Sequence, residues 1–147
     1  MNRLVIAAIA LVSVILTGCV EPEGTEQAVR SRIAVMESAL AQRSPTDFLD
    51  TLSASFLGGK SGRLDIDKPE AKKMLAVYFL RYSRIRVAIT QVEVVVDPYE
   101  QNLASASARV VLAGGERLIP NSAGVYQISS QWQNFDGHWK LTRLEWQ

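Results

Sequence analysis

The spacing of hydrophobic residues changes once along this chain, between Tyr82 and Ile85, and that change limits the possible folds more than any other feature. Before it, apolar residues recur every three or four positions, as they do on one face of an α-helix. After it, apolar and polar residues alternate, as they do in strands that bury one face. Helices followed by a run of strands predict an α+β domain of two layers, in which three helices pack on an antiparallel sheet.

Three segments have the composition of a helix start. Thr25 can cap a first helix, because a side-chain oxygen at that position can accept a hydrogen bond from the first turn. Ser44 precedes Pro45, and Asp67 lies two residues before Pro69. Both pairs indicate a helix start, because proline is favoured at the first helical positions. We therefore expect helices that begin near Thr25, Ser44 and Asp67.

Each predicted helix carries an apolar stripe that we expect to face the core. The second helix would continue past Phe56 and end at the glycine pair Gly58–Gly59, since glycine commonly ends helices. The three stripes consist of Val29, Ile33, Met36 and Leu40; of Phe48, Leu49, Leu52 and Phe56; and of Met74, Leu75, Tyr78, Phe79 and Tyr82.

The predicted strands slip in phase at two places. The apolar set moves by one residue between Ile89 and Val92, and again between Leu141 and Leu144. A phase slip within a strand indicates a β-bulge, and bulges bend sheets. The dipeptide Asp136-Gly137 predicts a tight hairpin turn before the last strand. The sheet is therefore expected to bend over the helices.

Two strands present small or polar residues to the expected core. Ala104, Ala106 and Ala108 form an alanine row, which precedes a turn expected at Ala113–Gly115. Small residues on a core face either let a helix approach closely, which is the more common reason, or leave a cavity. The inward residues of the following strand are Tyr126, Ile128, Ser130 and Trp132.

The chain begins with the pattern of an export signal. Arg3 precedes an apolar run, Leu4–Leu16, that is shorter than the ~20 residues needed to span a bilayer. The Leu-Thr-Gly-Cys ending at Leu16–Cys19 resembles the lipobox of bacterial lipoproteins, which implies cleavage before Cys19 and attachment of lipid to that residue. An ordinary signal peptide followed by a chance cysteine is the alternative.

The resemblance to a lipobox divides the chain into a signal peptide, residues 1–18, a lipidated tether, residues 19–24, and a folded domain, residues 25–147. Two or more acyl chains hold a protein stably on a membrane, and the tether would reach on the order of 20 Å. An aspartate after the cysteine would favour the inner membrane, so Val20 favours the outer one. We expect a domain anchored in the bacterial envelope and facing the periplasm.

Charge and cysteine content exclude several classes of function. Loss of the signal peptide removes one of the 16 basic residues, Arg3, and none of the 15 acidic ones, which leaves 15 of each and a formal net charge of zero. Such a domain lacks the positive charge of nucleic-acid-binding proteins. Cys19 is the only cysteine, so its lipidation leaves no thiol for a disulfide or a metal. No cluster of His, Asp and Glu has metal-ligand spacing, and no cofactor is expected.

Three amphipathic helices, long bulged strands and the closing hairpin segment Gln131–Leu141 resemble the nuclear transport factor two-like superfamily, which includes SnoaL-like cyclases and ketosteroid isomerase. The resemblance covers Thr25–Gln147. It implies a cone-shaped, cystatin-like roll with a cavity, which the superfamily uses in enzymes, binding proteins and assembly modules. The fold alone therefore does not decide the function.

The residues expected to face this cavity argue against acid–base catalysis. Enzymes of the superfamily place an Asp, a Tyr or a His–Asp pair inside the cone, whereas no acid interrupts the apolar alternation of these strands. His138 follows a tight turn and is expected to be exposed, Asp47 is expected to be a capping residue, and Asp50 is the carboxylate nearest an apolar stripe. The candidate ligand-binding residues are Tyr78, Tyr82, Tyr126, Ser130 and Trp132.

Basic residues gather around the end of the third predicted helix. They form either a solvated helix face whose arginines complement the helix C-terminus, or a patch for lipid head groups or an acidic partner. These residues are Lys72, Lys73, Arg81, Arg84 and Arg86.

Taken together, these expectations favour a non-enzymatic, membrane-anchored binding or assembly domain. Its partner would be a small apolar ligand, a second copy of the chain or an envelope protein. A second copy could pair through the polar outer sheet face around Ser129, Gln131 and Gln133. The alternative is a SnoaL-like periplasmic enzyme that acts on a small hydrophobic substrate.

Overall fold

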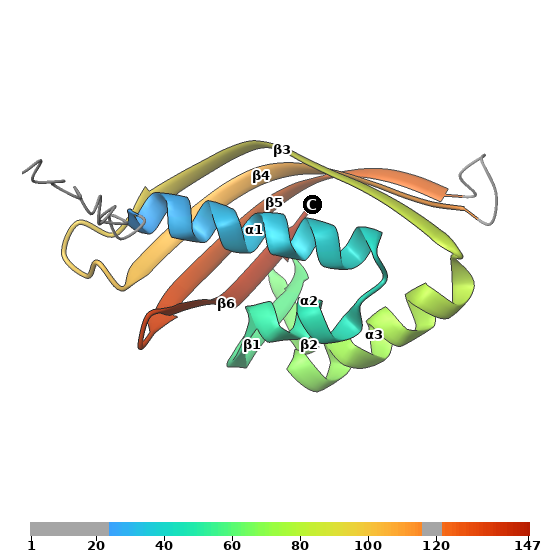
Figure 1. Ribbon diagram of the computed structural model, residues 1–147, viewed down its shortest axis with the longest axis horizontal. Helices are drawn as coiled ribbons and strands as arrows, with labels where there is room; N and C mark the ends of the chain where they lie inside the picture. The colour runs from blue at the N-terminus through green and yellow to red at the C-terminus, as the bar shows by residue number, and fades with distance from the viewer. Residues whose placement is uncertain (1–23, 116–121) are drawn as a thin grey trace, which may run out of the picture.

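Three helices pack against a strongly bent six-stranded sheet, part of which arches over them (Figure 1). The computed structural model describes residues 24–115 and 122–147, so the predicted signal peptide and Cys19 lie outside the described residues. The elements are α1 (Thr25–Ala41), α2 (Pro45–Thr51), β1 (Leu52–Lys60), β2 (Arg63–Asp67), α3 (Lys68–Arg81), β3 (Arg84–Val96), β4 (Leu103–Gly115), β5 (Ser122–Phe135) and β6 (His138–Trp146).

The strands form one sheet in the order β2-β1-β6-β5-β4-β3. Neighbouring strands are antiparallel except β1 and β6, which run parallel. The predicted α+β class, with three helices packed on a bent sheet, is confirmed. The sheet is mixed rather than wholly antiparallel, and it does not close, because β2 and β3 remain at its two edges.

Two of the three predicted helix caps are confirmed. Ser44 and Asp67 are the N-caps of α2 and α3, and each side chain accepts a hydrogen bond from the backbone N–H three residues further on. The expectation that Thr25 caps α1 is wrong, because Thr25 is already helical and Gly24 holds the cap position. The Gly24 carbonyl accepts a hydrogen bond from the Ala28 N–H at 3.0 Å.

The second helix is shorter than expected, and a strand follows it directly. α2 ends at Thr51, and the next nine residues form β1, which pairs with β2 on one side and β6 on the other. Leu52 and Phe56 are buried as expected, with 1% and 4% of their surface exposed, but they belong to β1. Their helical spacing was misleading because hydrogen bonding to two neighbouring strands outweighs local periodicity.

The glycine pair that was expected to end this helix instead forms an irregularity between β1 and β2. The register of the two strands shifts between Gly58 and Gly59. A Cβ atom on Gly59 would lie 1.9 Å from the carbonyl oxygen of Arg63, which no side chain could tolerate. Glycine is therefore required at this irregularity, where the backbone of Arg63 leaves no room for a side chain.

Both phase slips correspond to register shifts in the sheet. The pairing of β3 with β4 shifts around Gln91, which has a positive φ of 52°. In β5 and β6, Gln131 pairs with Arg143 and Trp132 pairs with Leu141, so the register shifts at Thr142. The Asp136-Gly137 turn is also confirmed, with φ values of 51° and 87°, as a two-residue hairpin with positive φ at both central positions requires.

The turn expected at Ala113–Gly115 is wrong, because β4 continues to Gly115 and pairs there with Arg84. Gly114 is needed within the strand for another reason. The ring of Tyr82 lies directly against it, and a Cβ atom on Gly114 would be 2.7 Å from that ring. The end of α3 is therefore packed against the far end of β4.

Side chains of α1 hold the edge strand β3 on both sides of its bulge. The Glu37 carboxylate accepts a hydrogen bond from the Ile89 N–H at 3.1 Å, and Arg30 Nη1 donates one to the Val92 carbonyl at 2.8 Å. These contacts fix α1 across the sheet. They also satisfy backbone groups on an open edge, which limits pairing with another chain.

Candidate functional site

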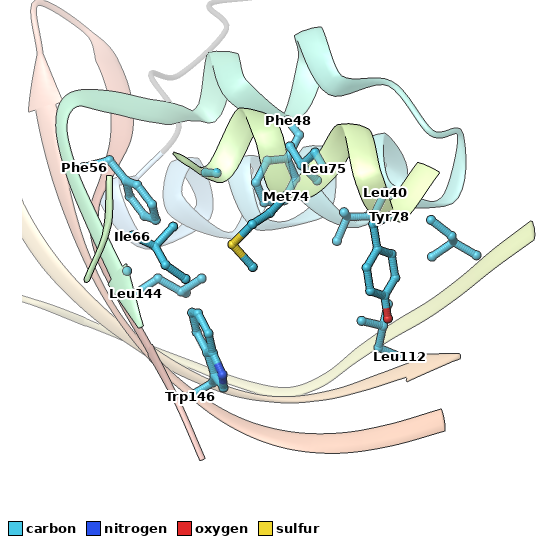
Figure 2. A pocket seen from close by; sticks show the side chains of 13 residues that line it. Leu40, Phe48, Phe56, Ile66, Met74, Leu75, Tyr78, Leu112, Leu144 and Trp146 are labelled. Carbon is cyan, nitrogen blue, oxygen red and sulfur yellow. The ribbon is translucent and has the colours of Figure 1, made fainter. Parts of the chain in front are cut away.

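Two adjoining hollows lie between the helices and the inner face of the sheet, with volumes of about 250 and 330 Å³. We treat them as one apolar cavity because they share much of their lining. Figure 2 shows Met74 extending from α3 into the space between Trp146 and Tyr78. The shared lining residues are Leu40, Phe48, Met74, Tyr78, Leu112, Leu144 and Trp146.

The alanine row helps to create this space. Ala104 and Ala106 both belong to the packed core, and Ala106 and Ala108 also line the cavity. The expected close packing therefore describes Ala104 and Ala106, whereas Ala108 lies on the cavity wall outside that core cluster.

Tyr126 leaves the centre of the cavity open because its ring lies back along its own strand. A Cβ atom on Gly124 would be 2.5 Å from the Tyr126 hydroxyl oxygen. The ring therefore covers Gly124, two residues away on the same face of β5, instead of standing upright between sheet and helices. Glycine at this position is what allows that orientation.

The polar groups on the wall are few and largely engaged. The Ser130 hydroxyl donates a hydrogen bond to the Ala106 carbonyl at 3.0 Å and accepts one from the Trp132 indole N–H at 3.0 Å. Tyr78, Tyr126 and Trp146 supply the other polar side-chain groups. Within the described part of the chain, no Asp, Glu, His, Lys or Arg lines the cavity.

Four of the five candidate ligand-binding residues line this cavity: Tyr78, Tyr126, Ser130 and Trp132. Tyr82 does not, because its ring is buried against Gly114 and packs with Leu75, Phe79 and Ile85. Its centroid lies 4.8 Å from that of Tyr78, so Tyr82 supports Tyr78 from behind. We did not name Trp146 as a candidate, although the phase slip in β6 turns it to the inner face.

Asp50 and His138 lie outside the cavity. Together with Arg32 and Lys140 they line a separate surface depression of about 240 Å³. Lys140 and Arg32 each donate to one Asp50 carboxylate oxygen at 3.1 Å, and these hydrogen bonds hold the pKa of Asp50 below its ordinary value of 3.8. His138 is exposed, and its Nδ1 is 3.1 Å from the Asp136 carbonyl oxygen. This arrangement is that of an ion-pair network on the surface.

The Asp50→Asn variant is expected to lose stability at neutral pH only. Ionised Asp50 stabilises the folded state above pH 3.8, and this contribution disappears as the pH falls through the lower folded pKa. The loss should be about 0.5–1 kcal/mol, since exposed ion pairs contribute little. Urea unfolding at pH 7 and at about pH 2 would measure it. An equal loss at both values would mean that the side chain matters for its shape and not for its charge.

The five basic residues do not lie at one point. Lys72 and Lys73 are in the second turn of α3 and Arg81 is at its end, a separation of about 13 Å along the axis. Arg84 and Arg86 begin β3, and all five side chains are exposed. Lys73 pairs with Glu70 at 3.1 Å, and the Arg81 guanidinium lies 5.6 Å from the centre of the Tyr82 ring. The patch remains a prediction.

Two other features are absent from residues 24–115 and 122–147. These residues contain no group of three or more His, Cys, Asp or Glu side chains that could hold a metal ion. None of the helices in the same ranges has the length and apolar character needed to cross a bilayer.

Comparison with known proteins identifies the fold. No family model and no curated protein matches the chain. An NTF2-like protein of unknown function from Pseudomonas putida has a TM-score of 0.68 at 13% identity, covering 82% of this chain and 84% of that one. A protein of unknown function with a cystatin-like fold from Nostoc punctiforme has a TM-score of 0.66 at 14% identity, covering 82% and 87%.

A third similar structure is an enzyme. The hexachlorocyclohexane dehydrochlorinase of Novosphingobium barchaimii has a TM-score of 0.66 at 12% identity, covering 82% of this chain and 84% of that one. At such identities the likeness concerns the fold alone. The chain thus has the nuclear transport factor two-like, cystatin-like fold that its sequence resembles, and its function must be argued from its own residues.

Proposed function

We propose that this chain is a lipid-anchored envelope protein whose domain binds a small, uncharged, apolar ligand without transforming it. The observation that carries the proposal is the absence of any charged side chain among the described residues that line the cavity. A buried charge without a partner is strongly unfavourable. The cavity is therefore suited to an aliphatic or aromatic molecule that ends in a hydroxyl or carbonyl group.

The position of Met74 supports access for such a ligand. Met74 lines the cavity and is also 47% exposed. Solvent therefore reaches the lining at α3. An unbranched methionine side chain adapts readily to different apolar shapes, so its movement would admit a ligand without displacing the backbone.

An enzyme that acts on a small hydrophobic substrate is the alternative, because one protein of similar fold is named as a dehydrochlorinase. Proton transfer requires a side chain of suitable pKa within hydrogen-bond reach of the substrate. Among the described residues, the cavity wall offers no carboxylate or imidazole. Tyr78 and Tyr126 line the cavity and could orient a substrate there.

Binding of 1-decanol and decanoate compares a neutral ligand with a charged one of the same length. We expect decanol to bind at pH 8 and decanoate to bind at least ~10-fold more weakly, because its carboxylate would have no cation to pair with. The fluorescence of Trp132 and Trp146, which line the cavity, would report binding. Tighter binding of decanoate would contradict the proposal. Recovery of binding near pH 4, where the acid becomes neutral, would support it.

Pairing through the outer sheet face also remains a prediction. Ser129 and Gln131 are exposed on that face, with Gln133 half-buried beside them. We expect a weak homodimer, since these uncharged polar groups can hydrogen-bond to a second copy at little desolvation cost. Sedimentation of the protein over a range of concentrations would detect it. A strict monomer at the highest concentration would leave this face to a different partner or to none.

A further inference from the structure

The first turn of α1 shares one end of the molecule with two loops of the sheet (Figure 1). One is the β3–β4 loop, residues 97–102, and the other is the β5–β6 turn. The Asn134 N–H donates to the Asn102 carbonyl at 2.8 Å, so the two loops are adjacent. Ala28, the fourth residue of α1, and Gly137 of the turn line the same surface depression, which places the start of α1 beside the β5–β6 turn. We call this region the α1 end.

Two aromatic side chains project from the α1 end. Tyr99 is 93% exposed and Phe135 is 42% exposed. The loop that carries Tyr99 is held in shape, because the Asp97 carboxylate accepts hydrogen bonds from the backbone N–H groups of Tyr99 and Glu100 at 2.8 and 2.9 Å. Tyr99 is therefore presented to the surroundings by an ordered turn.

Exposed apolar residues also occur elsewhere, and Leu80 near the end of α3 is 87% exposed. What distinguishes the α1 end is the length of chain that leads to it. Only five residues separate Cys19 from Thr25, where α1 begins. A lipid on Cys19 would keep the first turn of α1 within roughly 20 Å of the bilayer.

We propose that the α1 end docks on the lipid bilayer, with the side chains of Tyr99 and Phe135 inserted at its surface. This inference rests on the lipid anchor in the proposed function. Aromatic rings settle at the membrane–water interface, where an apolar body and a polar tip are both accommodated. Insertion of the two rings turns a flexible attachment into a defined orientation.

The charges around these rings indicate which lipids suit the docked state. Glu100 and Asp136 lie in the same two loops, whereas the basic side chains Arg32 and Lys140 are paired with Asp50. Attraction to anionic head groups therefore does not drive docking, and a zwitterionic bilayer, such as one of phosphatidylethanolamine, suits the docked state. Docking would also hold the cavity, which lies against the second half of α1, away from the bilayer.

Site-specific quenching tests this orientation in the full lipidated protein. Tyr99→Cys and Leu80→Cys variants would each carry an NBD fluorophore and be reconstituted into phosphatidylethanolamine vesicles that contain a lipid-borne quencher. The two sites are comparably exposed but lie near opposite ends of β4. Leu80 is close to Tyr82, whose ring packs against Gly114, whereas residue 99 is in the loop that leads to Leu103. Gly114 and Leu103 are eleven residues apart, or about 36 Å along the strand. We expect the label at residue 99 to be quenched at least ~3-fold more strongly.

Flotation of the vesicles separates failure of docking from failure of anchoring. Equal quenching at both sites in protein that floats with the vesicles would overturn the docking inference and leave the anchor intact. Protein that does not float with them would contradict the anchor and the docking together. Adding phosphatidylglycerol should leave the quenching at residue 99 unchanged. A marked increase would show that anionic lipids drive the contact and would overturn the mechanism proposed here.

Discussion

Under the proposed lipid anchor, replacing Cys19 by serine is expected to remove the protein almost completely from the outer membrane, the location proposed for it. The substitution takes away the sulfur to which lipid would be attached. Each buried methylene of an acyl chain contributes about 0.8 kcal/mol, so losing two or three chains removes far more than any surface contact could supply. No helix within the described ranges could replace the anchor by crossing the bilayer.

Membrane fractionation of wild type and the Cys19→Ser variant would measure this effect, and mass spectrometry of the mature amino terminus would identify its cause. We expect an acylated Cys19 at that terminus in the wild type. Val20→Ala is a suitable control, since it changes the adjacent residue and retains the sulfur. An unmodified Cys19, or the same membrane distribution for wild type and the Cys19→Ser variant, would contradict the anchor.

The Trp132→Ala variant is expected to be the most damaging substitution in the inner face of the sheet. Trp132 is 2% exposed and pairs across the sheet with Ala104 and Leu141, which are also buried. Truncating a buried tryptophan costs about 3–5 kcal/mol, through lost burial and the cavity that remains. Because domains are stable by only about 5–15 kcal/mol, this substitution would remove a large share of the free energy of unfolding.

Urea unfolding of Trp132→Ala and Trp132→Phe would divide this cost into its parts. Phenylalanine keeps much of the buried ring but loses the hydrogen bond from the indole N–H to Ser130. We expect Trp132→Phe to lose about 1–2 kcal/mol, as for one buried hydrogen bond and a modest change of volume. A loss below about 1 kcal/mol for Trp132→Ala would mean that the inner sheet face packs differently from the arrangement described.

The sequence predicts the fold best where one local signal has a single structural outcome. Ser44 and Asp67 begin helices because a capping side chain and a following proline both favour that conformation. The slip around Gln91 indicates a bulge because one extra residue in a strand moves every following side chain to the opposite face of the sheet. These features need no knowledge of the rest of the chain.

Prediction fails where partners distant in sequence decide the outcome. Leu52 and Phe56 have helical spacing, but β6, more than eighty residues later, draws their segment into the sheet. Gly114 has the composition of a turn, whereas the contact that requires glycine there comes from the ring of Tyr82. Neither partner can be identified from local pattern alone.

In the candidate site, too, the local pattern predicts some features, and the packing of the folded chain decides others. Alternation along β5 placed Tyr126, Ser130 and Trp132 on the inner face, and all three line the cavity. The size of the cavity could not be predicted, because it depends on the bend of the sheet. It also depends on the ring of Tyr126 lying over Gly124, and a sequence pattern does not specify side-chain orientation.

Titration of 1-decanol into the wild type and two phenylalanine variants tests the cavity most directly. Ala108→Phe would fill the cavity from the sheet, whereas Ala88→Phe adds the same group on the exposed side of β3. We expect the wild type and Ala88→Phe to bind decanol alike and Ala108→Phe to bind at least ~10-fold more weakly, because apolar binding follows the apolar area removed from water. Equal binding by all three folded proteins would contradict a ligand site in this cavity.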